Sequence, residues 1–462
     1  LGDCYFLSTL ASMAEWPDRI KRLFEIDTVN EQGIYAVKVC DMGVWKTVII
    51  DDYFPCSPDT RKPIFTRSNG NELWVMILEK VWAKIYGGYA RIEAGLTREC
   101  LHDLTGAPTK YFLTGNPNTY EEIWKELLNG EKSHYIMTAG AGDFFEGADL
   151  LSSIGLVGSH AYSLLSVAEV KDKYGKNVRL VRLRNPWGQS EWTGDWSDNS
   201  SLWTPELRRQ LGVEKKDDGI FFMPYEEFLK HFEDVQFCMI YDHYEYTSFR
   251  VKSSPKKAAY IKMNISSGGK YFITVNQKSK RHFPENSNYE YTPVTLIVCR
   301  VSHNEVELVE GIQRADREVW VEGHLRPGEY IIYVKIPWLS GQSNDFVISA
   351  YGPGKAGFQS TNKKVCPNLL ESAFSNYARK SKRLQSYAGD GEPDCFNATD
   401  LTTMGFGYCY YRNKSCKTLE VEVFYKEFIG LKLRKPHTGR EFSLVVGPGE
   451  EAIVLLKTLP RS

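Results

Sequence analysis

The stretch GSHAYSLLSVAEVKDKYGKNVRLVRLRNPWG, residues 158–188, contains two strand-like runs with a polar residue at a boundary of each. His160 opens the first run, which is apolar, and Asn185 ends the second, where Pro186 fixes a turn. Each residue alone has an ordinary explanation, because a histidine in an apolar strand is more often structural and Asn before Pro is a common turn former. Their interpretation therefore depends on a third residue, far upstream.

That residue is Cys4, in the segment LGDCYFLSTLASMAEW at residues 1–16. Apolar residues recur there at helical spacing from Asp3, a good N-cap type, until Pro17 stops the pattern. Cys4 thus lies in the first turn of a predicted helix, where the backbone N–H groups and the helix dipole favour the reactive thiolate. A cysteine on an amphipathic helix is, however, more often a small core residue.

Together the three residues favour catalysis. A cysteine protease needs a thiolate, a histidine that takes and returns the proton, and an Asn or Asp that orients the imidazole. Cys4, His160 and Asn185 occur in the order Cys, His, Asn, with the cysteine on a helix and the other two in a β-rich half. This order is typical of papain-like enzymes and predicts an α+β fold with a two-lobed cysteine protease core.

Composition narrows the class of protein. The chain has 462 residues, is 42% hydrophobic and has a formal net charge of −1, so no global field favours nucleic acid, and we expect no nucleic-acid partner. No apolar run reaches the length of a membrane span, and the N-terminal stretch lacks the features of a secretory signal. The ten cysteines contain no CxxC pair, which favours reduced thiols and a cytoplasmic location.

The predicted elements divide the chain into four parts. Strands at GIYAVKVC and WKTVIIDDYFP and a helix at ELWVMILEKVWAKIYGG, ended by Gly87 and Gly88, form a helical lobe at 1–115. A short helix, YEEIWKELLNG, and runs such as SHYIMTAG and GIFFMPYEEF form a β lobe at 116–243. Short alternating strands predict a β-sandwich at 244–354. A boundary, YGPGKAGFQSTNKK, then a basic helix, a loop and further strands lie in 355–462, a second β-rich domain.

Six ordered motifs resemble those of the calpain family, which are papain-like, calcium-dependent cysteine proteases. They are LGDCYFLSTLAS, VIIDDYFP, GNELWVMILEKVWAKIYGGYARI, GSHAYSLL, RLRNPWGQSEWTGDWSD and DGIFFMPYEEFLKHF, which together span about residues 1–240. The strands at 244–354 resemble more loosely the sandwich called calpain domain III, and 355–462 is expected to be a further sandwich of that kind. The resemblance implies an intracellular endopeptidase that cleaves protein substrates.

By this resemblance Cys4 is the nucleophile, His160 the general base and acid, and Asn185 the residue that orients the imidazole. Trp187 is the indole that blocks the cleft without calcium and moves aside when calcium binds. The polar loop around it holds two further tryptophans, Trp192 and Trp196, for which a packing role is the simpler interpretation.

The resemblance also implies calcium as cofactor, bound by hard oxygen ligands in each lobe. Glu191, Asp198 and Asp218 stand at carboxylate positions of the β lobe, whereas Ile220 occupies a fourth position without an oxygen ligand. In the helical lobe Glu72 matches. Its acidic partner, and the glutamine that helps to form the family's oxyanion hole, would both precede residue 1, so we expect the sequence to be a fragment.

Two alternatives come from other classes. A catalytically silent calpain-like scaffold would bind proteins or phospholipid through its β domains, but intact Cys4, His160, Asn185 and Trp187 disfavour it. A transglutaminase-like acyl transferase would have an Asp as third member, so Asn185 disfavours that class. No D-x-[DN]-x-[DN]-G loop occurs, and we therefore expect no pairing with a calpain small subunit.

Overall fold

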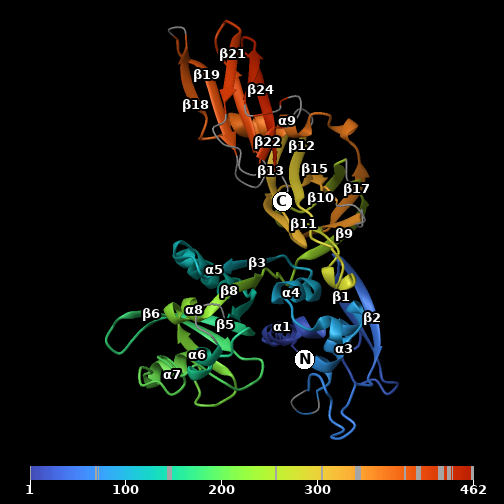
Figure 1. Cartoon of the computed structure of the whole chain (residues 1–462), viewed down its shortest axis with the longest axis vertical. Coiled ribbons are helices and arrows are strands. Elements are labelled where there is room, and N and C mark those ends of the chain that lie inside the picture. The colour runs from blue at the N-terminus through green and yellow to red at the C-terminus, as the bar shows by residue number, and fades with distance from the viewer. Residues whose placement is uncertain are drawn as a thin grey trace. The chain divides into compact units, whose positions relative to one another are not determined.

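The chain forms two compact units, Leu1–Asp242 and His243–Ser462 (Figure 1). The fold belongs to the predicted α+β class, with helices and antiparallel sheets in the first unit followed by mainly β structure. This computed structural model describes residues 2–67, 70, 72–142, 148–254, 257–302, 305–338, 345–389, 392–401, 407–424, 431–433, 437, 439 and 441–458.

The first lobe of the N-terminal unit is built from helices around a two-stranded hairpin. Its elements are α1 (Cys4–Ala14), α2 (Pro17–Lys21), β1 (Ile34–Asp41), β2 (Val44–Asp51), α3 (Trp74–Tyr86), η1 (Tyr89–Ile92) and α4 (Thr97–Thr105). The predicted strands and the long helix are confirmed, and Gly87 ends α3 in the left-handed conformation at a φ of 96°. Pro17 has a second role that was not predicted, because it begins α2 at the first helical position.

The second lobe is a six-stranded sheet in the order β3-β8-β4-β5-β6-β7. The strands are β3 (Thr109–Leu113), β4 (Ile136–Ala141), β5 (His160–Lys171), β6 (Asn177–Arg184), β7 (Ile220–Pro224) and β8 (Phe232–Cys238). Helices α5 (Tyr120–Ser133), α6 (Ala148–Ser153), α7 (Pro205–Leu211) and α8 (Tyr225–His231) accompany them, with a 3-10 turn, η2, at Pro117–Thr119.

Two expectations about this lobe differ from the structure. The run GIFFMPYEEF was expected to be strand throughout, but β7 ends at Pro224 and the following residues begin α8, whose N-cap is that proline. The sheet also includes β3, which pairs with β8 although it precedes residue 116. Acidic residues in the first turn of α8, Glu226 and Glu227, favour the helix through its dipole.

The C-terminal unit begins with a β-sandwich. One sheet has the order β13-β12-β15-β10-β17 and the other β14-β11-β16-β9, and buried aliphatic and aromatic side chains from both form the core. The strands are β9 (Glu245–Lys252), β10 (Ala259–Ile265), β11 (Gly269–Asn276), β12 (Val294–Ser302), β13 (Glu305–Arg314), β14 (Glu318–Leu325), β15 (Gly328–Lys335), β16 (Asp345–Gly352) and β17 (Ala356–Thr361), with η3 at Lys280–His282. The stretch expected to be a boundary thus contains β17, which pairs with β10.

The remaining elements are also mainly strands. They are η4 (Lys363–Val365), α9 (Leu369–Arg379), β18 (Gln385–Gly389), β19 (Glu392–Leu401), β20 (Gly407–Asn413), β21 (Leu419–Phe424), β22 (Leu431–Leu433), β23 (Glu441–Val446) and β24 (Glu451–Thr458). The helix expected after the boundary is confirmed as α9. The loop expected after it contains β18 and β19, which pair with each other.

Candidate active site

Helix α1 lies against the sheet of the second lobe, along β5 and β4. Ser163 Oγ donates to the carbonyl of Ser8 at 3.0 Å, and Ser12 Oγ donates to the carbonyl of Met137 at 3.2 Å. Met137 pairs with Leu164 of β5, so Ser12 lies near Leu164. Ser8 lies near Ser163, so α1 approaches the start of β5 as the helix is followed back toward its N-terminus. One further turn back is Cys4, so the cysteine lies at the end of α1 that is nearest the start of β5.

That start of β5 is His160, which is buried and hydrogen-bonded to Asn185. The distance from His160 Nε2 to Asn185 Oδ1 is 2.9 Å. An amide oxygen can only accept, so Nε2 carries a proton, and in the neutral imidazole Nδ1 is then the free acceptor. The contact therefore selects the tautomer that can take a proton at Nδ1.

Both the oxygen and the nitrogen of the Asn185 side-chain amide make further hydrogen bonds. Its Oδ1 also accepts from the Trp187 backbone N–H at 3.1 Å, and its Nδ2 donates to the carbonyl of Ser190 at 3.3 Å. The Asn185 backbone N–H donates to the carbonyl of Gly219 at 2.8 Å, which ties the end of β6 to the start of β7. The side chain is completely buried, so these bonds fix its orientation in a dry site.

Two aromatic rings enclose the imidazole. The ring centroids of His160 and Trp187 are 4.5 Å apart, and Tyr162 contacts the imidazole edge to face at 5.1 Å. Burial lowers the pKa of His160 from its ordinary value of 6.5, and the hydrogen bond to Asn185 opposes this shift. Trp187 remains 54% exposed, so one indole both covers the histidine and faces solvent.

The other two tryptophans of this loop are interior residues. Trp196 is buried against Trp203, with ring centroids 4.7 Å apart, in a cluster with strand residues of β5, β6 and β7. Trp192 is buried and donates its indole N–H to the carbonyl of Asp195 at 2.8 Å. Their large rings anchor the loop, so that Trp187 can be held at the surface.

The first turn of α1 has an arrangement that sequence reasoning missed. Asp3 occupies the N-cap position, but its side chain makes no capping hydrogen bond, contrary to expectation. It lies instead against Glu79 of α3. Tyr5, on the other side of Cys4, accepts from the Trp82 indole at 3.1 Å and donates to the carbonyl of Ile92 at 2.8 Å. The residues that flank Cys4 are thus both held by the α3 region.

Three acidic residues of the second lobe interact electrostatically. Glu191 Oε1 accepts from the backbone N–H groups of Asp218 and Gly219, at 2.9 and 2.8 Å. The pKa of Glu191 is raised, mainly by burial and also by Asp198. Burial likewise raises the pKa of Asp198, with Asp218 adding to the effect. Repulsion among these carboxylates is the condition that a divalent cation would relieve.

Ile220 lines the same region. It lines a cavity of about 260 Å³ together with Asp198, Asp218 and Arg182. The residue contributes no oxygen from its side chain, and its backbone N–H donates to Asp218 Oδ1 at 3.0 Å. Positive charge from Arg182 and Arg208 opposes this rise in the pKa of Asp198. The cavity therefore offers hard oxygen donors, but arginines already offset some of their charge.

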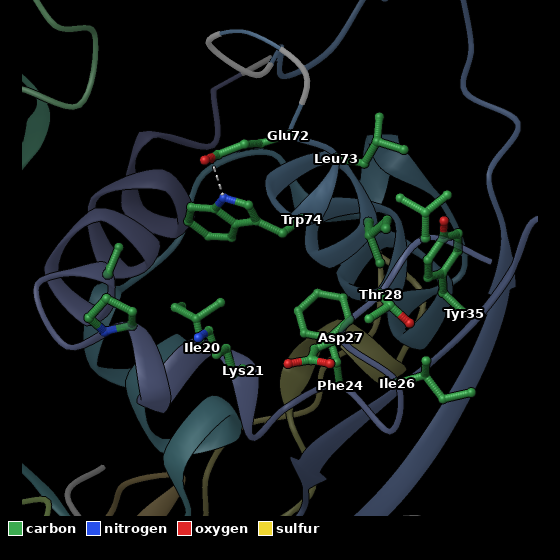
Figure 2. A pocket seen from close by; sticks show the side chains of 14 residues that line it. Ile20, Lys21, Phe24, Ile26, Asp27, Thr28, Tyr35, Glu72, Leu73 and Trp74 are labelled. Carbon is green, nitrogen blue, oxygen red and sulfur yellow. Dashed lines mark hydrogen bonds between the residues drawn. The ribbon is translucent and has the colours of Figure 1, made fainter.

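In the first lobe, Glu72 lies at the rim of a larger cavity. Its Oε2 accepts from the Trp74 indole N–H at 2.8 Å (Figure 2). The cavity measures about 510 Å³ and has a mostly apolar lining, to which Phe24, Ile77 and the side chain of Asp27 contribute. Glu72 is exposed and so can still offer an oxygen to a cation.

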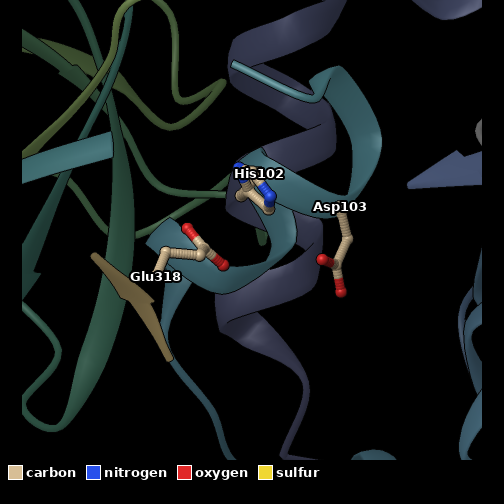
Figure 3. Close-up of side chains that lie close together, drawn as sticks. All are labelled: His102, Asp103 and Glu318. Atoms are coloured by element: carbon tan, nitrogen blue, oxygen red, sulfur yellow. The ribbon is translucent and has the colours of Figure 1, made fainter. Parts of the chain in front are cut away.

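Helix α4 holds a buried histidine and aspartate that were not predicted as site residues. His102 and Asp103 are adjacent on the helix (Figure 3). His102 Nδ1 is 3.0 Å from the carbonyl of Ala107, and Asp103 accepts from the Tyr86 hydroxyl at 3.0 Å. Both therefore have structural partners within the first lobe. Glu318, also drawn there, belongs to β14 of the C-terminal unit.

Among the residues that the structure describes, no helix is long and apolar enough to cross a membrane. The nine cysteines whose side chains are described are free thiols.

Comparison with known proteins gives the family. The family model for calpain family cysteine proteases matches residues 1–239. The calpain-type cysteine protease ADL1 of Oryza sativa subsp. japonica is 37% identical over 249 residues, which cover 52% of this chain and 11% of that protein. The calpain-2 catalytic subunit of Rattus norvegicus is 34% identical over 52% of this chain and 34% of its own length, and human calpain-9 is 33% identical over 52% and 35%.

The chain therefore matches only a part of each of these relatives. Among solved structures, Yersinia pseudotuberculosis-derived mitogen aligns with 24% of this chain and 86% of its own at 14% identity, but its TM-score of 0.16 does not indicate a shared fold. The family match extends over the whole segment that contains Cys4, His160 and Asn185. On this evidence the chain belongs to the calpain family of cysteine proteases.

Proposed function

We propose that this protein is a calcium-dependent intracellular endopeptidase that cleaves protein substrates with Cys4, His160 and Asn185. The observation that supports it best is the 2.9 Å contact between His160 and Asn185. His160 is the first residue of β5, and the first turn of α1 lies toward that start of the strand. The domains proposed for it are a helical lobe, 1–115, a β lobe, 116–243, and two β-rich domains, 244–354 and 355–462.

In this mechanism His160 takes the thiol proton of Cys4, and the thiolate attacks the carbonyl carbon of the substrate. The imidazolium then returns the proton to the leaving amine, and a water molecule, activated by the same imidazole, hydrolyses the thioester. Asn185 keeps the ring in the productive tautomer through its hydrogen bond to Nε2. The backbone N–H of Cys4, at the N-terminus of α1, supplies a donor for the oxyanion.

Calcium is the proposed cofactor. Glu191, Asp198 and Asp218 would contribute ligands in the second lobe, and Glu72 in the first. The raised pKa values of Glu191 and Asp198 support this assignment, because each carboxylate is more costly to ionise without a nearby cation. Ile220 and the neighbouring arginines are expected to weaken the second-lobe site.

The first test replaces the proposed nucleophile. Cys4→Ser is expected to abolish cleavage of a peptide substrate, because a serine hydroxyl is a far weaker nucleophile beside the same imidazole. Cys56→Ser is the control, since Cys56 is an exposed free thiol far from α1 in sequence and should leave turnover unchanged. Full turnover in the Cys4 variant would refute the assignment.

A covalent thiol probe separates an enzyme from a silent scaffold. A peptide-epoxide inhibitor should protect Cys4 from labelling in the enzyme, because the peptide part must occupy a working cleft. Labelling of Cys4 that this inhibitor does not reduce would favour the scaffold, whose β domains would bind proteins or phospholipid.

A further inference from the structure

Residues 3 to 6 are attached to α3 by side chains on both sides of Cys4. Tyr5 is bonded to Trp82, and the Phe6 ring stacks on the Trp82 ring with centroids 5.2 Å apart. Asp3 contacts Glu79, which is one turn before Trp82 on the same helix. Cys4 therefore takes its position from α3 as well as from its own helix.

The contact between Asp3 and Glu79 joins two buried carboxyl groups. Asp3 is 4% exposed and Glu79 is 2% exposed. Glu79 also accepts from the Thr66 hydroxyl at 2.7 Å and from the Thr66 backbone N–H at 3.3 Å. Asp3 Oδ2, in contrast, has no hydrogen-bond donor near it and is buried. Since two ionised carboxylates only accept, a hydrogen bond between them requires one proton.

We propose that Asp3 and Glu79 share one proton and act as positioning residues for Cys4, so that loss of this proton sets the alkaline limit of the reactivity of the thiol. This inference rests on the proposed function for its meaning in catalysis. With the proton in place, the pair holds a single negative charge and a hydrogen bond that fixes the first turn of α1. Without it, two buried carboxylates repel each other beside the cysteine, and the added charge opposes a thiolate there.

The charged neighbours of the pair do not neutralise it. Burial, reinforced by Asp3, raises the pKa of Glu79 to about 8. Tyr89 on η1 also interacts electrostatically with Glu79. Burial, together with the charges of Glu79 and Asp51, raises the pKa of Tyr89 to about 12. Lys80, next to Glu79 on α3, binds Asp51 at 2.6 Å instead.

Glu93 and His160 complete the set of nearby titratable groups. The side chain of Glu93 lies beside Gly2, 3.6 Å from where a Cβ at that glycine would be, so its charge adds to the acidic side of the site. His160 is the titratable group of the facing strand β5, toward whose start the first turn of α1 leads. Because burial lowers the pKa of His160, its own protonation belongs to the acid side of the profile, separate from the alkaline change that we assign to the pair.

The sign of the pH dependence follows from the raised pKa. An ordinary glutamate releases its proton near 4.5, whereas folded Glu79 keeps it until about 8. Between these values the folded protein binds more protons than the unfolded chain, so its stability falls as pH rises. This stabilisation is fully present below about 4.5 and is lost as the pH passes about 8. Each pH unit within the window shifts the folding equilibrium by up to about tenfold.

The experiment compares the full chain with Glu79→Gln. Glutamine keeps an acceptor for Thr66 and can donate its amide N–H to Asp3, so the variant needs no shared proton. The melting temperature of the variant relative to the original protein should rise from pH 5 to 8 and then level off. Asp3→Asn should behave in the same way, and it provides a second route to the result if Glu79→Gln does not fold. A difference in melting temperature that does not vary with pH in either variant would overturn the shared proton.

Alkylation of Cys4 tests the positioning role. The rate of modification by iodoacetamide, read by mass spectrometry on the Cys4 peptide at temperatures below unfolding, should drop above pH 8 relative to Glu79→Gln, by about threefold or more. Glu131→Gln is the matched control, since Glu131 is a carboxyl on α5 of the second lobe whose pKa is also raised, mainly by partial desolvation of its side chain. That control should leave the Cys4 profile unchanged. Identical Cys4 profiles in the original protein and in Glu79→Gln would refute the proposal.

Alkylation does not require peptide cleavage, so this proposal and the proposed function can fail separately. A shifted Cys4 profile in a chain that cleaves no peptide would refute only the function. Cleavage by a chain with unshifted Cys4 profiles would refute only the pair.

Discussion

At the scale of single residues, the amide of Asn185 links the imidazole to the loop that contains Trp187. Its oxygen accepts from both His160 Nε2 and the Trp187 backbone, and its nitrogen donates to Ser190. One side chain thus fixes the tautomer of the imidazole and the start of the loop whose indole covers that imidazole. A change at Asn185 should therefore act on catalysis through His160.

We expect the effects of His160→Ala and Asn185→Ala not to be additive. Loss of a general base reduces the rate by about 10²–10⁴-fold, and loss of Asn185 should reduce it less, because the imidazole still reaches the thiol part of the time. Since both act through the same ring, the double variant should match His160→Ala. Rates of peptide cleavage for the four proteins, with melting temperatures measured in parallel, give the comparison. A double variant that lost the product of the two single effects would contradict a shared role.

At the scale of elements, the junction between β6 and β7 depends on a glycine. Gly219 has a φ of +83°, and a Cβ there would lie 2.7 Å from the carbonyl oxygen of Asn185 and 3.0 Å from Gly188 Cα. Both neighbours are backbone atoms, which cannot rotate away. The close approach of these segments requires glycine for its missing side chain as well as for its conformation.

Gly219→Ala should therefore both destabilise the second lobe and slow cleavage. A residue forced into this conformation costs about 1–3 kcal/mol, and displacement of the Gly219 carbonyl would also move Asn185. Gly175→Ala is a matched control, because its φ of +84° is nearly the same and nothing lies within 4 Å of its added Cβ. Thermal unfolding and kcat for both variants separate backbone strain from the close contact. Equal effects of the two substitutions would show that the approach to Asn185 is unimportant.

At the scale of the whole molecule, the two lobes of the N-terminal unit each contain part of the proposed calcium machinery. Glu72 belongs to the first lobe, and Glu191, Asp198 and Asp218 to the second. Glu191 accepts from the Gly219 backbone N–H, and the Gly219 carbonyl accepts from the Asn185 backbone N–H. The acids of the second lobe are therefore connected to Asn185 through Gly219. Binding of a cation there would therefore act on the segment that orients the histidine.

Calcium is expected to raise the melting temperature and to change tryptophan emission, because Trp187 is half exposed and covers His160. Asp198→Asn should move the calcium midpoint upward, and Ile220→Glu should move it downward by adding an oxygen ligand. Glu206→Gln, an exposed acid on α7, is the control and should leave the midpoint unchanged. Peptide cleavage that proceeds equally in excess chelator, without a calcium effect on emission or melting, would leave a constitutive papain-like protease.

Much of the secondary structure could be predicted because its causes are local. Helix α3 has an apolar face and ends at Gly87, and the alternating strands of the sandwich lie where the pattern predicted them. Elements without such a pattern were missed, among them β17 and β18, whose residues are largely exposed or polar. These strands exist because a neighbouring strand satisfies their backbone hydrogen bonds, which is a property of the partner and not of the segment.

The sequence by itself determined the family motifs, the order of Cys4, His160 and Asn185, and the placement of the cysteine in the first turn of a helix. Those features depend on residue type and spacing along one segment at a time. Only the tertiary structure decided that Asp3 faces Glu79 and makes no cap, and that the carbonyl of Gly219 holds Asn185. The physical reason is that burial and through-space contact between distant segments set hydrogen bonds and pKa values, and no local pattern encodes either.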